Sequence, residues 1–167
     1  THPVGATSLV HAAGEDPLTM ARHVECEDCH DPHAANTLLG APVPGVPGGM
    51  LAVDGVDGDG LHVLTPSSGY EVCYKCHAGT NPGNPALPRQ FVESDVSVEF
   101  DPGYGSFHPV ETVGKSGDVP SLLPPWTTSS RLGCEDCHAG DGPVSGPHGS
   151  EQEWILKRRY DTDDYAV

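Results

Sequence analysis

Three short runs of the chain place two cysteines and a histidine at a spacing that can do chemistry. They are CEDCH at 26–30, CYKCH at 73–77 and CEDCH at 134–138, and together they hold all six cysteines. Two thiols separated by two residues and followed directly by a histidine are the signature of covalent haem attachment. The thiols bond the porphyrin, and the neighbouring imidazole binds the iron. The sequence therefore predicts three covalent c-type haems.

Each run supplies two attachment sites and one iron ligand. The predicted attachment residues are Cys26, Cys29, Cys73, Cys76, Cys134 and Cys137. The predicted proximal iron ligands are His30, His77 and His138.

Zinc and disulfides are the alternatives for the same cysteines. A structural zinc ion usually takes two CxxC pairs, so three pairs leave one over. Neither zinc nor disulfides explain why a histidine follows every pair. Haem is therefore the favoured interpretation.

The sixth ligand of each iron is expected to be histidine. The chain has ten histidines and only two methionines, and a low-spin haem usually takes its second ligand from one of these two residue types. Bis-histidine ligation predicts low potentials and an electron carrier, not an enzyme. The histidines outside the three runs are His2, His11, His23, His33, His62, His108 and His148.

The elements that must position these ligands are expected to be few. The chain has 21 glycines and 17 prolines, which favour loops and turns. We expect one domain over 1–167, with halves at about 1–90 and 91–167, mostly irregular with short helices and little β-structure, wrapped around a haem stack that serves as the core. Each CxxCH run should form one helical turn, so that its thiols and imidazole face one macrocycle.

Three further elements are expected outside the haem runs. The alternation of Val96, Val98 and Phe100 predicts a strand within 91–100. Ser150 and Glu153 before an apolar run predict a capping box and a helix of about two turns. A short helical turn is expected at 18–21. The tryptophans and the tyrosines Tyr70, Tyr74 and Tyr160 are expected to pack in the core or on haem.

The residues around the runs resemble those of multihaem c-type cytochromes with paired CxxCH motifs. The resemblance rests on CEDCHDPH at 26–33, YEVCYKCH at 70–77, FHPVE at 107–111 and GPHGS at 146–150. It implies an electron-transfer protein, and some similar cytochromes polymerise into extracellular filaments in which one subunit completes a haem of its neighbour.

The resemblance also implies which histidines complete the irons. His2 would complete the haem on Cys26 and Cys29, His33 the haem on Cys73 and Cys76, and His108 the haem on Cys134 and Cys137. His148 would then be surplus or would reach a haem in another subunit. His11, His23 and His62 are expected to be solvated or hydrogen-bonded.

Charge and composition limit the partners. The net charge of −16 argues against nucleic acid and anionic membranes and favours a basic redox partner or an extracellular electron acceptor. Apolar runs are too short to span a bilayer. The acidic loop 54–60 could bind calcium, but it lacks a bidentate glutamate at the expected spacing, so a solvated turn is favoured.

Covalent haem is installed outside the cytoplasm, so we expect a periplasmic or extracellular protein, mature and without its signal peptide. Two other functions stay open. A multihaem reductase would keep one iron five-coordinate, which the excess of histidines disfavours. The chain could also be one module of a larger multihaem cytochrome.

Overall fold

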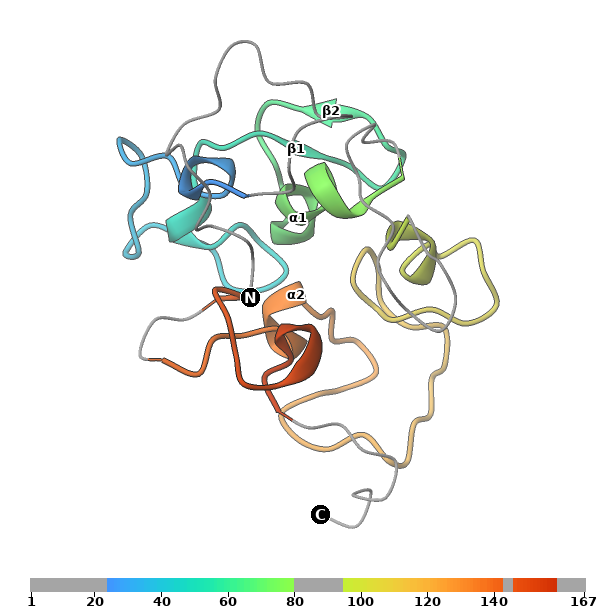
Figure 1. The fold of residues 1–167 in the computed structure, drawn as a ribbon. Helices are drawn as coiled ribbons and strands as arrows, with labels where there is room; N and C mark the ends of the chain where they lie inside the picture. Colours follow the sequence, from blue (N-terminus) through green and yellow to red (C-terminus); the bar gives the residue numbers. More distant parts are fainter. Residues whose placement is uncertain (1–23, 80–94, 143–145, 159–167) are drawn as a thin grey trace.

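The computed structural model describes residues 24–79, 95–142 and 146–158, and the fold over these residues consists mainly of loops (Figure 1). The longest regular element is α1, Gly69–His77, which carries the second haem run. The third run begins α2, Cys134–Cys137, and the first begins the 3₁₀ turn η1, Cys26–Asp28. The expectation of an irregular fold with short helices is confirmed.

The β-structure is minimal. Strands β1, Gly55–Val56, and β2, His62–Val63, pair antiparallel and enclose the acidic loop. Single 3₁₀ turns complete the set: η2, Gly48–Met50, η3, Ser97–Glu99, and η4, Glu153–Ile155. Among the described helices, none has the length and apolar composition that crossing a bilayer requires.

Two predicted elements are wrong where the structure describes them. Residues 95–100 form η3 and its flanks instead of a strand, because the Asp95 carboxylate accepts hydrogen bonds from the backbone N–H and the hydroxyl of Ser97 and starts a turn. Residues 91–94 lie outside the described part, as does the helical turn expected at 18–21.

The helix predicted from Ser150 is reduced to the single turn η4. Trp154 and Ile155 have φ of 62° and 58°, a left-handed conformation that ends a helix. The Ser150 hydroxyl donates to the Leu156 carbonyl instead of capping a helix. The following residues pair with the third haem run, since Ala139 N–H donates to Ile155 O and Lys157 N–H to Cys137 O.

The apolar core is small and surrounds α1. Of the described hydrophobic side chains, those that are buried are Val53, Val72, Tyr74, Ala78, Val110 and Ala139. Tyr74, inside the second haem run, is only 1 % exposed, which confirms its expected place in the core. Trp154 is 51 % exposed, so it is not part of the protein core, and packing on haem stays a prediction for it. Tyr160 lies outside the described residues.

A buried hydrogen bond joins α1 to a distant loop. The Tyr74 hydroxyl donates to Glu111 Oε1 at 2.8 Å, and the Tyr74 ring lies near the rings of Tyr70 and Phe100. Burial raises the pKa of Glu111, and the bond from Tyr74 partly offsets this. The same burial and the same bond raise the pKa of Tyr74, so the phenol stays protonated and keeps donating.

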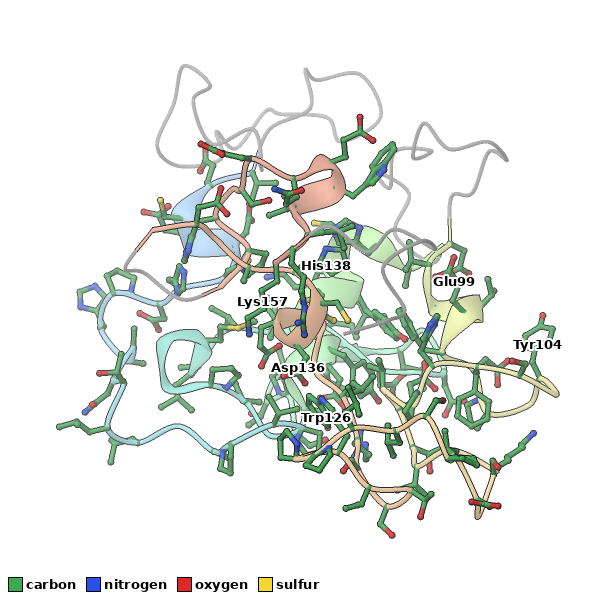
Figure 2. The ribbon with its side chains drawn as sticks, turned by 90° about the horizontal axis from the view of Figure 1, so that it is seen from below. Glu99, Tyr104, Trp126, Asp136, His138 and Lys157 are labelled. Carbon is green, nitrogen blue, oxygen red and sulfur yellow. The ribbon has the colours of Figure 1, made fainter. Side chains whose placement is uncertain are left out.

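We expect Tyr74→Phe to lower the free energy of unfolding by about 1–2 kcal/mol, because it leaves a half-buried carboxylate without its donor. Urea unfolding of the haem-loaded protein, followed by circular dichroism, measures this. Tyr104→Phe is the control: Tyr104 lies at the edge of the molecule (Figure 2), 54 % exposed, and its change should stay within about 0.5 kcal/mol. Equal effects of the two substitutions would contradict the role given to the Tyr74–Glu111 bond.

Candidate haem-binding sites

Each CxxCH run forms one helical turn, as the motif requires. His30 N–H donates to Cys26 O at 2.9 Å, and His138 N–H donates to Cys134 O at 2.8 Å. In the second run the turn is the end of α1, which includes His77. Residues three and four apart share a face of a helix. Both cysteines and the histidine of each run therefore lie on one side of their turn.

The two CEDCH runs start their turns in the same way. The Asp28 carboxylate accepts a hydrogen bond from Glu25 N–H, and the Asp136 carboxylate accepts one from Gly133 N–H, both at 2.8 Å. An acidic side chain in the first turn satisfies a backbone donor that the helix leaves unpaired. The shared Glu-Asp pair is thus explained by local folding.

The CYKCH run differs because its helix begins earlier. Helix α1 starts four residues before Cys73, with Ser68 at its N-cap, and Glu71 accepts hydrogen bonds from the backbone N–H groups of Ser67 and Ser68. Position 75 has no capping role, so a lysine can stand where the other runs have aspartate. Lys75 Nζ instead donates to Asp54 Oδ1 at 2.7 Å.

Two proximal histidines are oriented by backbone carbonyls. His30 Nδ1 lies 2.6 Å from Gly49 O, and His138 Nδ1 lies 3.0 Å from Trp154 O. Such a contact holds the proton on Nδ1, leaves Nε2 as the lone-pair nitrogen and fixes the ring for metal binding. Figure 2 shows His138 with Asp136 and Lys157 around α2.

The carbonyl partners are held by close backbone packing. A Cβ on Gly48 would lie 2.0 Å from Asn36 O, so only glycine allows the loop to close on Asn36, whose N–H donates to Gly48 O at 2.7 Å. That closure places Gly49 beside His30. At the other site, Trp154, whose carbonyl contacts His138, has a positive φ. This backbone conformation is strained for a residue other than glycine, and such strain is typical of functional positions.

Helix α1 brings the three runs together. Helix α1 lies against α2, and the nearby Cys134 thiol is the largest cause that raises the pKa of Cys73, followed by burial. Burial raises the pKa of Cys29, Lys75 opposes this, and Cys76 is among the groups that add to it. The second run therefore touches the third run and lies close to the first. All six cysteines are free of disulfides.

The predicted distal histidines are placed as follows. His33 is exposed in a turn where its N–H donates to Asp31 Oδ1 at 2.8 Å. The ring of His108 lies 6.2 Å from that of Phe100. The next residue is tied to the segment just before the third run, since Leu132 N–H donates to Pro109 O at 2.8 Å. His2, His11 and His23 lie outside the described residues.

His148 is the predicted residue whose position the sequence did not suggest. Its ring lies near that of His30, a predicted proximal ligand, with centroids 5.9 Å apart and planes 20° from parallel. No sequence signal links the first run to the segment 146–150.

The acidic loop is held by its own neighbours. Asp54 contacts Lys75 and His62, each at 2.7 Å, and Asp57 Oδ1 accepts from the backbone N–H groups of Asp59 and Leu61. His62 is thus hydrogen-bonded, as expected. Among the described residues, no group of three or more histidine, cysteine, aspartate or glutamate side chains is placed to hold a metal ion.

The chain's surface fits a large apolar cofactor. Large apolar side chains such as Leu38, Leu39 and Leu64 are 90 %, 71 % and 78 % exposed. The helical turns, the oriented imidazoles and this uncovered apolar surface together fit covalently held haem.

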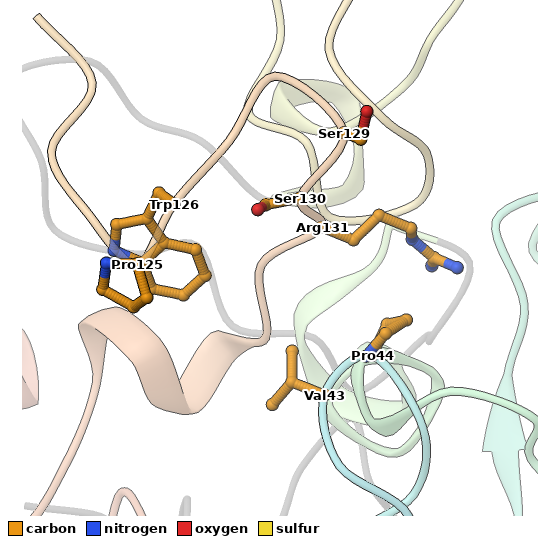
Figure 3. Close-up of a pocket in the computed structure, with 7 residues that line it drawn as sticks. All are labelled: Val43, Pro44, Pro125, Trp126, Ser129, Ser130 and Arg131. Atoms are coloured by element: carbon orange, nitrogen blue, oxygen red, sulfur yellow. The ribbon is translucent and has the colours of Figure 1, made fainter.

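An open pocket lies elsewhere, between the 43–44 loop and residues 125–131 (Figure 3). Its lining contains neither cysteine nor histidine. Arg131 at its edge donates from Nε and Nη2 to Val110 O, so this guanidinium ties the residues before α2 to the loop after His108. None of the pocket's lining residues belongs to a CxxCH run.

Comparison of the chain with protein-family models, with curated proteins and with solved structures finds no match.

Asp54 provides a pH test of how the second run is held. Burial would raise the pKa of Asp54, but hydrogen bonds from Lys75 and His62 outweigh it and lower the pKa below its ordinary value of 3.8. A lowered pKa in the folded state stabilises the protein above the ordinary value, and that stability is lost as the pH falls through the folded value.

We expect Asp54→Asn to lower the free energy of unfolding at pH 7 by up to about 1 kcal/mol, because the pair is partly exposed and screened. The difference from the parent protein should shrink as the pH falls below 3.8. Urea titrations of the haem-loaded protein over this range measure it, with Asp118→Asn, an exposed aspartate, as control. A deficit that persists at low pH would show that Asp54 acts through something other than its charge.

Proposed function

We propose that this chain is an electron-transfer protein with three covalent c-type haems, each held by one CxxCH run and a second histidine. The observation that supports the proposal is the orientation of two imidazoles that directly follow the cysteine pairs. His30 and His138 each direct Nδ1 to the backbone carbonyl of a loop remote in sequence, Gly49 O and Trp154 O. A free thiol pair has no need of an oriented imidazole, and a zinc site would not explain why a histidine follows every cysteine pair. When bound, each haem supplies a one-electron redox centre.

The chain's own residues would set the spacing and environment of these centres. Helix α1 contacts α2 through Cys73 and approaches the first run through Cys76. Adjacent attachment points place neighbouring macrocycles next to each other, as an electron relay requires. Lys75 is a cation among acidic groups beside these sites, and such charges tune redox potentials.

The location, partners and assembly of the protein follow from the same proposal. Covalent haem attachment implies a periplasmic or extracellular protein, and the acidic surface suits a basic redox protein or an extracellular acceptor. The excess of candidate ligands over iron positions supports assembly of the chain into a homo-oligomer or filament, with a histidine shared between subunits.

The proposal is tested by producing the chain in cells that attach c-type haem. We expect the intact mass to show three haems per chain, reversible one-electron titration of each, and low-spin signals from all three by electron paramagnetic resonance. The double substitution Cys73→Ala/Cys76→Ala should reduce the count to two. Tyr70→Phe, in the same helix but without a thiol, is the control and should keep three haems.

Two results would overturn this function. Purified protein that carries zinc or disulfides and no haem would exclude it. A stoichiometric high-spin ferric haem in the native protein would instead support a reductase with an open iron.

A further inference from the structure

The rings of His30 and His148 lie near each other with almost parallel planes. Their centroids lie 5.9 Å apart and their planes differ by 20°. Nearly parallel rings that stack with good overlap lie closer, because optimal carbon contacts are about 3.5–4.0 Å. At this separation the two rings make at most an offset contact with little overlap.

The separation matches that of two imidazoles on one metal ion. Rings that bind a metal from opposite sides have centroids roughly 6 Å apart, because each nitrogen lies about 2 Å from the metal and about 1 Å from its ring centre. His30 is the proximal ligand that the first CxxCH run supplies. If His148 bound the opposite face of the same haem, the two rings would have this separation.

The same edge of each imidazole, the Nδ1–Cε1 edge, lies beside the backbone of a glycine. His30 Nδ1 contacts Gly49 O at 2.6 Å. At the other ring, a Cβ added to Gly146 would lie 3.2 Å from Cε1 and 3.6 Å from Nδ1 of His148. A glycine backbone thus lies against the Nδ1–Cε1 edge of each imidazole. This arrangement leaves Nε2 of both rings for a shared metal.

We propose that His148 is the second axial ligand of the haem on Cys26 and Cys29, opposite His30 and within the same chain. This inference rests on the proposed function. It departs from the assignment implied by the resemblance, in which His2 completes this haem and His148 is surplus. With His148 bound to the first iron, His2 becomes the histidine without an iron in its own chain.

The test is His148→Gly in the haem-loaded chain, with three haems confirmed by mass. We expect one of the three low-spin signals to convert to high-spin, and added imidazole to restore it by filling the vacated position. His62→Gly is the matched control, because His62 is an exposed histidine bonded to Asp54, and should leave all three haems low-spin. His2→Gly should do the same in dilute, monomeric protein.

A second variant covers the case in which the glycine substitution prevents folding. His148→Met keeps a ligand of another type, and methionine raises the potential of a haem relative to histidine. One of the three potentials should therefore rise while the other two stay unchanged.

Different results would contradict the proposed function and the assignment of His148 as a ligand. If haem does not attach to the parent chain, the proposed function fails. If three haems attach but His148→Gly keeps three low-spin signals, and His148→Met keeps three unchanged potentials, the ligand assignment fails alone. A high-spin haem in dilute His2→Gly protein would instead identify His2 as the second ligand of the first iron.

Discussion

The structure depends on one steric property: two thiols and one imidazole from five consecutive residues lie on one face, as attachment to a single macrocycle would require. Only a helical turn puts these side chains on one face, and each of the three runs forms such a turn. A single turn is unstable alone, since its first backbone donors have no partner within the helix. The carboxylates of Asp28, Glu71 and Asp136 supply the missing acceptors.

The rest of the chain holds the turns together through polar contacts more than through an apolar core. Tyr74 bonds Glu111, Lys75 bonds Asp54, and Arg131 bonds the carbonyl of Val110. Each contact joins a haem run, or the residues just before one, to a loop remote in sequence. Extended helices would keep the runs apart, whereas glycine- and proline-rich loops let the chain fold back on α1.

The sequence predicts the parts of this protein that obey local rules. The helical turns follow from the motif, and the scarcity of regular structure follows from composition. The strand at 91–100 was predicted from alternating Val96, Val98 and Phe100, but Asp95 starts a turn with its own side chain, and local hydrogen bonds outweighed periodicity. The helix after Ser150 fails because 155–157 pair with the third run, a tertiary contact that no local pattern reveals.

The residues of the candidate site also differ in whether local sequence rules predict their grouping. Cysteines and proximal histidines are contiguous in sequence, so their grouping needs no knowledge of the fold. The partner of His30 comes from the far end of the chain, and its proximity depends on the close Asn36–Gly48 packing and on the glycine at 146 that lies against the ring. Sequence order suggests the nearer His2, but order along a chain with few regular elements says little about distance in space.

The place of the surplus ligand changes how assembly would work. If His148 were surplus, an intersubunit bond would start from a loop packed against the first haem run, and forming it would break the contact with His30. If His2 is surplus, the bridging histidine belongs to the N-terminal segment, and the three intrachain sites stay intact whether or not a second copy is bound. Assembly would then add a ligand without dismantling a haem site, which is the simpler physical route from a folded subunit to a polymer.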